Sequence, residues 1–152
     1  MKITGEKSLS TIVKLLLKTI FILGLGVIIG LPVILRWYIE NFRVDINNYY
    51  PMLMLLYVSG VTALYIVFKF VKLFKALEDN KPFIAENVEI LKNISIGCLV
   101  IAVLYLIGIF IFNSVFVAVI FMIFTIAYFA FLILAELFRQ AVQYKEENDL
   151  TI

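Results

Sequence analysis

The stretch ISIGCLVIAVLYLIGIFIFNSVFVAVIFMIFTIAYFAFLILA, residues 94–135, decides the fold of this chain. It contains no Asp, Glu, Lys or Arg, and the polar pair Asn113-Ser114 divides it into two apolar halves. A bilayer core about 30 Å thick requires roughly 20 apolar residues in a helix. Residues 94–112 and 115–135 each have this length. The stretch therefore predicts two membrane helices joined by a tight turn.

Two more apolar stretches, residues 12–35 and 52–68, precede this hairpin. Hydrophobic residues make up 64% of the 152 residues, whereas soluble domains contain about 45–50%. We predict an all-α integral membrane protein, a bundle of four transmembrane helices over about 12–35, 52–77, 85–112 and 115–144. Residues 1–152 would form a single membrane domain. The first stretch resembles a signal peptide, but bulky Arg36-Trp37-Tyr38 follow it in place of a cleavage site, which favours a retained helix.

Positive charge is distributed unevenly between the two sides of this predicted bundle. Of the 13 Lys and Arg residues, 11 lie in the N-terminal segment, the connection before residue 94 and the C-terminal tail. The other two lie in the loop at residues 36–50. Cytoplasmic segments of membrane proteins are enriched in Lys and Arg. The pattern predicts a multi-pass protein with both termini in the cytoplasm.

The connection between the second and third spans continues the helical pattern into the cytoplasm. Lys69, Lys72 and Lys75 recur at helical spacing among apolar residues, so they form a basic face. This face either anchors the helix on anionic headgroups, at roughly 1 kcal/mol per lysine, or contacts a cytoplasmic partner. After a turn at Pro82, an amphipathic helix begins. Its predicted inner stripe is Ile84, Val88, Leu91 and Ser95, and its predicted polar side is Glu86, Glu89 and Lys92.

Small residues in the first span predict a close helix contact. Gly26 and Gly30 are four residues apart, a spacing that lets another helix approach the backbone. We expect this face to carry helix packing, while the oligomeric state stays open.

The residue types that most enzymes use are missing or badly placed. The chain has no histidine, which removes the commonest general base and metal ligand. Proton-coupled carriers need an ionisable residue near the midplane of the membrane. The central parts of the predicted spans contain no Asp, Glu, Lys or Arg over residues 19–35, 51–68, 95–112 and 115–135. We therefore expect no enzyme activity, no cofactor, no metal and no direct binding of nucleic acid.

Two cytoplasmic motifs carry a resemblance to a known family. They are KPFIAENVEILKNI at residues 81–94 and EENDLTI at residues 146–152. With four predicted helices, they make the whole chain similar to the bacterial membrane family called domain of unknown function 2975. Members are often encoded beside a small helix-turn-helix regulator. The resemblance implies the bacterial cytoplasmic membrane and coupling to transcription, and it assigns no catalytic residue.

The leading functional hypothesis is a non-enzymatic regulatory protein whose cytoplasmic face binds a soluble partner, such as a small DNA-binding regulator. The predicted partner-binding residues are Pro82, Phe83, Glu86, Asn87, Asp149, Leu150, Thr151 and Ile152. One alternative is an immunity or envelope-stress protein that protects the membrane from a peptide toxin through residues 36–50. Another is a small carrier or a subunit of a membrane complex.

Overall fold

The computed structural model describes residues 4–42, 45–79 and 83–150, without the side chains of residues 4–10, 77–78 and 149–150. Over these residues the chain forms four long α-helices and one turn of 3-10 helix. The elements are α1 (Thr4–Phe42), η1 (Ile46–Asn48), α2 (Tyr49–Glu78), α3 (Ala85–Phe112) and α4 (Val115–Leu150). All four α-helices are long and apolar enough to cross a membrane. The predicted fold class, an all-α bundle of four membrane-spanning helices, is confirmed.

Two of the helices are much longer than a bilayer requires. α1 has 39 residues and α4 has 36, which at 1.5 Å per residue makes them about 58 Å and about 54 Å long. α1 continues seven residues past the predicted end at Leu35, and Pro32 lies inside it. Because a hydrocarbon core is only about 30 Å thick, both helices project beyond it.

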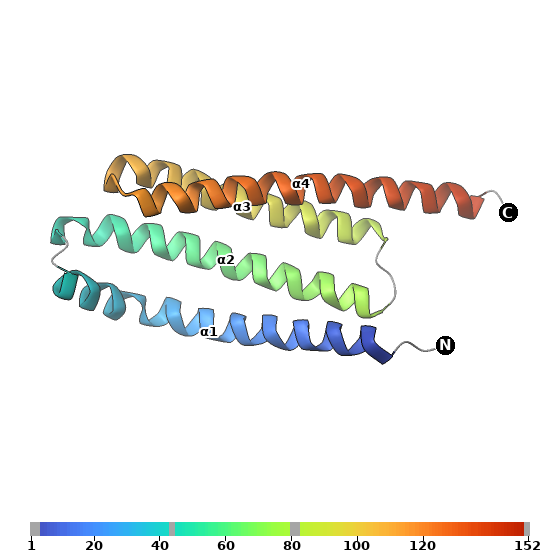
Figure 1. Ribbon diagram of the computed structural model, residues 1–152, viewed down its shortest axis with the longest axis horizontal. Helices are drawn as coiled ribbons and strands as arrows, with labels where there is room; N and C mark the ends of the chain where they lie inside the picture. The colour runs from blue at the N-terminus through green and yellow to red at the C-terminus, as the bar shows by residue number, and fades with distance from the viewer. Residues whose placement is uncertain (1–3, 43–44, 80–82, 151–152) are drawn as a thin grey trace.

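The helices run antiparallel in chain order, and α2 lies between α1 and the α3–α4 hairpin (Figure 1). α3 packs most extensively against α4, and α1 packs mainly against α2. The start of α1, the end of α2, the start of α3 and the end of α4 lie at one end of the bundle, which we call the terminal end (Figure 1). The opposite end, the turn end, holds η1 and the turn between α3 and α4.

The predicted tight turn between the third and fourth helices has a defined backbone geometry. Asn113 is left-handed, with φ 45° and ψ 44°, and its N–H donates a 3.0 Å hydrogen bond to the carbonyl of Ile109. Asparagine tolerates this conformation better than most residues, and a left-handed residue is a common way to end a helix. α4 then starts at Val115, two residues later.

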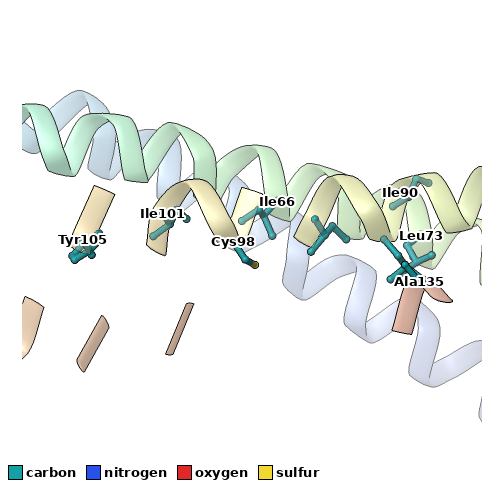
Figure 2. Close-up of a cluster of buried hydrophobic side chains, with 9 residues drawn as sticks. Ile66, Leu73, Ile90, Cys98, Ile101, Tyr105 and Ala135 are labelled. Carbon is teal, nitrogen blue, oxygen red and sulfur yellow. The ribbon is translucent and has the colours of Figure 1, made fainter. Parts of the chain in front are cut away.

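The buried core follows α3, which is the most enclosed helix. Figure 2 shows side chains of α2, α3 and α4 gathered along it, including Ile66, Cys98, Tyr105 and Ala135. Leu91 and Ile94 are completely buried. The predicted inner stripe is confirmed at Val88, Leu91 and Ser95, all buried. α1 lies outside this cluster.

Glycines allow close approach between neighbouring helices, but they are not the predicted pair. An added Cβ on Gly24 would lie 2.6 Å from Leu64 of α2, and one on Gly97 of α3 would lie 2.8 Å from Ile66 of α2. A Cβ on Gly26 would meet nothing within 4 Å, and one on Gly30 would meet only Ile34 of its own helix. Within the described chain, the predicted packing face at Gly26 and Gly30 therefore touches no other helix.

The rotation per residue of an α-helix explains why Gly24, and not Gly26, faces α2. Each residue turns an α-helix by about 100°, so Gly24 and Gly26 point in nearly opposite directions. Only one of the two can face α2, and Gly24 does. A close helix contact at Gly26 and Gly30 requires a second molecule, and it stays a prediction.

Candidate functional site

One of the predicted partner-binding residues, the aromatic Phe83, lies at the terminal end of the bundle. Phe83 lies just before α3 and remains 44% exposed. Its ring centroid lies 5.5 Å from that of Phe138 on α4, with the planes at 51°. This distance is within the range of favourable aromatic pairs. The contact joins the segment before α3 to α4 and leaves part of the Phe83 ring accessible.

Glu86 and Asn87 occupy opposite environments in the first turn of α3. Glu86 is exposed, where its negative charge interacts favourably with the positive end of the helix. Asn87 is completely buried, and its backbone N–H donates a 3.0 Å hydrogen bond to the carbonyl of Ile84. The burial of Asn87 could have been predicted from the sequence, because Asn87 precedes the buried Leu91 by one helical turn. Its side chain supports the fold of the site and is not displayed on the surface.

The predicted partner-binding residues at the C-terminus lie mostly outside the part of the chain that the structure describes. Pro82, Thr151 and Ile152 lie outside the described residues, and so do the side chains of Asp149 and Leu150. α4 remains helical through Leu150, twelve residues beyond Phe138. At 1.5 Å per residue, its end projects about 18 Å past the Phe83–Phe138 contact. The backbone of α4 therefore leads away from this contact as far as Leu150.

A cavity of about 430 Å³ lies at the terminal end between α2 and the start of α3. Sequence reasoning assigned Lys72 and Lys75 to a basic face but did not place them in a cavity. The sequence feature that could have predicted this cavity lining is the spacing of Lys72, Lys75 and Asp79, which places the three residues on one side of α2. The lining residues are Lys72, Lys75, Ala76, Asp79, Ile84, Glu86, Asn87 and Ile90.

An ion pair lies where the apolar stretch of α4 ends, just after Ala135. Arg139 donates hydrogen bonds from Nε and Nη2 to the two carboxylate oxygens of Glu136. Gln140 donates a third hydrogen bond, of 3.3 Å, to Oε1 of Glu136. Both charged side chains are about half exposed. The pair therefore resembles an interfacial ion pair in contact with water.

The turn end holds a second polar cavity, of about 360 Å³, beside the C-terminal part of α1. Arg36 and Glu40 form an exposed ion pair at 3.1 Å. The Tyr49 hydroxyl donates a long 3.4 Å hydrogen bond to the carbonyl of Pro32. The cavity is lined by Pro32, Val33, Arg36, Trp37, Glu40 and Tyr49.

Between the two ends, a third hollow of about 380 Å³ lies among the helices and is lined almost entirely by apolar side chains, with Ser59 and Tyr105 as exceptions. The Ser59 hydroxyl donates to the carbonyl of Leu56 in its own helix. Among the described residues, no group of three or more His, Cys, Asp or Glu could hold a metal ion. Of the three cavities, the one at the terminal end has the most charged side chains in its lining.

Comparisons with known proteins give information only on the family to which the chain belongs. No curated protein and no solved structure matches the chain. The family model described as "Protein of unknown function (DUF2975)" matches residues 40–152, which run from the end of α1 through α4. Because this match covers well over half of the sequence, the chain belongs to the DUF2975 family, as its motifs predict.

Proposed function

We propose that this protein is a non-enzymatic membrane protein whose terminal end faces the cytoplasm and binds a soluble partner. The observation that carries the proposal is the exposure of Phe83 beside Phe138, at an end where the helices project beyond the apolar stretches. Leaving an aromatic ring partly in water costs a fraction of the roughly 1.5–3 kcal/mol of free energy that full burial of such a side chain contributes. A partner that covers it gains that free energy.

The distribution of positive charge supports the proposed orientation of the protein in the membrane. The segments that meet at the terminal end contain 11 of the 13 Lys and Arg residues. This excess supports a cytoplasmic location for the terminal end. A bacterial cytoplasmic membrane is the location that the family resemblance implies.

The surroundings of Phe83 resemble the anatomy of a protein interface. Energetically important positions are often aromatic residues near the centre, surrounded by a polar rim. Three residues after Phe83, exposed Glu86 supplies a charged group in the first turn of α3. The partner that this proposal favours is a small helix-turn-helix regulator encoded beside the gene.

Co-purification from mild detergent tests the proposal. Full-length protein and a tagged neighbouring regulator are expressed together, and the regulator retained on the membrane protein is quantified. We expect Phe83→Ala to reduce retention at least tenfold, because truncating a central aromatic residue costs about 2 kcal/mol or more. The matched control is Tyr50→Ala, which removes an exposed aromatic ring at the turn end. Unchanged retention in Phe83→Ala, with a normal melting curve, would refute the proposal.

A second candidate function rests on the cavity at the turn end. Trp37, Arg36 and Glu40 surround a polar hollow that would face outward in this orientation. An immunity protein that intercepts a membrane-active peptide would use such a surface. In that case Trp37→Ala would increase the sensitivity of cells to the peptide, whereas Phe83→Ala would not.

A further inference from the structure

The apolar hollow among the helices is lined by a buried hydroxyl that has no partner within the bundle. Tyr105 of α3 lines this hollow one helical turn after Ile101 and is only 8% exposed (Figure 2). In the part of the chain that the structure describes, its side chain forms no hydrogen bond. Buried tyrosine hydroxyls usually find a hydrogen-bond partner, because an unpaired hydroxyl is costly in apolar surroundings. The hollow therefore has a donor available for a bound molecule.

A second hydroxyl lines the same hollow from α2. Ser59 is 7% exposed, and its hydroxyl donates a 3.3 Å hydrogen bond to the carbonyl of Leu56. This distance exceeds the usual range of about 2.5–3.0 Å for hydrogen bonds between a hydroxyl and an oxygen. Because the bond is long and the hydroxyl rotates freely, Ser59 can turn toward a bound molecule. Two different helices thus each provide one hydroxyl to the hollow.

Both hydroxyl-bearing residues lie near the middle of their apolar stretches. Ser59 is one residue from Gly60, the midpoint of residues 52–68, and Tyr105 is two residues from Val103, the midpoint of residues 94–112. At 1.5 Å per residue, these offsets are only about 1.5 Å and about 3 Å. In a hydrocarbon core about 30 Å thick, the polar headgroups begin about 15 Å from the middle. An occupant of the hollow is therefore a molecule that dissolves in the hydrocarbon itself.

The remaining walls of the hollow carry no charge. Among the described residues that line it, none is Asp, Glu, Lys or Arg, so a charged molecule would lose its hydration there without gaining a counter-charge. The volume of about 380 Å³ lies within the usual range for small-ligand pockets. Tyr105 and Phe124 of α4 supply two aromatic rings, which favour a flat ring over a flexible chain. The walls therefore select an uncharged, lipid-soluble molecule that contains a ring.

A quinone combines these properties. Its ring is flat and uncharged, and it has carbonyl oxygens on opposite edges, each of which accepts hydrogen bonds. We propose that the hollow binds the ring of a lipid-soluble quinone, with one carbonyl oxygen accepting a hydrogen bond from Tyr105 and the other facing Ser59. This proposal concerns binding alone and includes no redox step. The quinone site is independent of the proposed soluble partner, which binds at the terminal end, and goes beyond that function.

Other occupants complement the hollow less well. The acyl chain of a phospholipid has no oxygen at this depth, because its ester groups lie at the headgroup boundary, so it would leave the Tyr105 hydroxyl unpaired. A buried water molecule typically makes about three hydrogen bonds, whereas the side chains that line the hollow offer two hydroxyls. A quinone carbonyl needs only one donor.

The test uses the purified full chain in lipid-free detergent micelles and two matched probes. One is a benzoquinone with a decyl chain and methyl groups at its other ring carbons, which prevent addition of thiols. The other is the benzene with the same substituents, which lacks the two carbonyl oxygens. At a concentration ten times the dissociation constant, the quinone should raise the unfolding midpoint by about 3–6 °C, and the benzene at the same mole fraction should raise it less. Equal shifts would show that the hollow accepts any apolar molecule and would overturn the proposal.

Tyr105→Phe tests whether the hydroxyl holds the quinone. This variant removes one oxygen atom and no hydrogen bond within the described chain, so the protein without quinone should unfold at an unchanged temperature. Its affinity for the quinone should fall about tenfold, as expected for the loss of one buried hydrogen bond. The matched control is Tyr128→Phe, which removes a tyrosine hydroxyl from the apolar stretch of α4 outside the lining of the hollow. The control should bind the quinone as tightly as the unchanged protein.

Infrared spectroscopy of the bound quinone detects the hydrogen bond directly. Donation from Tyr105 weakens the carbonyl bond, so a carbonyl band of the bound quinone should lie at lower wavenumber than in empty micelles. Tyr105→Phe should return this band to its position in micelles. A band that does not move on binding, an unchanged affinity in Tyr105→Phe, or an equal loss of affinity in Tyr128→Phe would each overturn the proposal.

Discussion

Replacing Gly97 by alanine is expected to disturb the contact between α2 and α3. The new methyl carbon would lie 2.8 Å from Cγ1 and 3.1 Å from Cδ1 of Ile66, and 3.8 Å from Cγ2 of Thr62. Ordinary contacts between carbon atoms occur at about 3.5–4.0 Å. Ile66 is itself buried in the core, and its Cγ1 is attached directly to the branched Cβ. The side chain therefore has little room to withdraw, and the helices must separate slightly.

The expected change in the stability of the Gly97→Ala variant is the net result of two opposing effects. Overpacking a well-packed core costs typically 1–3 kcal/mol. Alanine also favours a helix over glycine by about 0.8–1 kcal/mol. Gly26→Ala is the matched control, because nothing lies within 4 Å of its new methyl group and only the second effect applies. Gly97→Ala should therefore be less stable than Gly26→Ala by about 1–3 kcal/mol.

The measurement is unfolding of both variants in the same detergent, followed by circular dichroism. A difference of 1–3 kcal/mol corresponds to about 2–12 °C in the midpoint for a chain of this size. In an Ile66→Ala background the clashing atoms are gone, so Gly97→Ala should add no further cost there. If Gly97→Ala is as stable as Gly26→Ala in the otherwise unchanged protein, the close approach of α2 and α3 at Gly97 is refuted.

Two further expectations concern topology and the hairpin turn. A reporter fused after Ile152 should be active in the cytoplasm and a cysteine at Asn47 should be labelled from outside; an outward C-terminus would contradict the orientation and the proposed partner binding together. Asn113→Ala should destabilise the hairpin by about 1 kcal/mol, because left-handed backbone is costly for alanine, whereas Asn113→Gly should be neutral or better in thermal unfolding. Equal stability of the two Asn113 variants would show that the turn relaxes to another conformation.

The sequence alone was sufficient for the parts of the structure that depend on local composition. Apolar length predicts the four spanning helices, since the preference for lipid is a property of each segment by itself. The Asn113-Ser114 interruption predicts the tight turn. Polarity also predicts the inner stripe at the start of α3, because that part of the helix lies beyond the apolar stretch, where a polar face and a buried face differ in composition.

The candidate site could be predicted only in part. The motif beginning at residue 81 directs attention to Phe83 and Glu86, and both are accessible at the terminal end. The burial of Asn87 and the cavity between Lys72 and Glu86 depend on how α2 and α3 are placed against each other. The projection of α4 away from Phe83 depends on the helix remaining unbroken to Leu150.

Only the tertiary structure decided which faces of the apolar helices meet. The sequence pointed to Gly26 and Gly30, whereas Gly24 and Gly97 make the close approaches. In water, a buried helix face is marked by its hydrophobicity, so a sequence pattern can indicate it. In a bilayer, the lipid is as apolar as the interior of the bundle, and packing of side-chain shapes selects the contact face. Such shape complementarity exists only between two placed helices, and no single segment of sequence contains it.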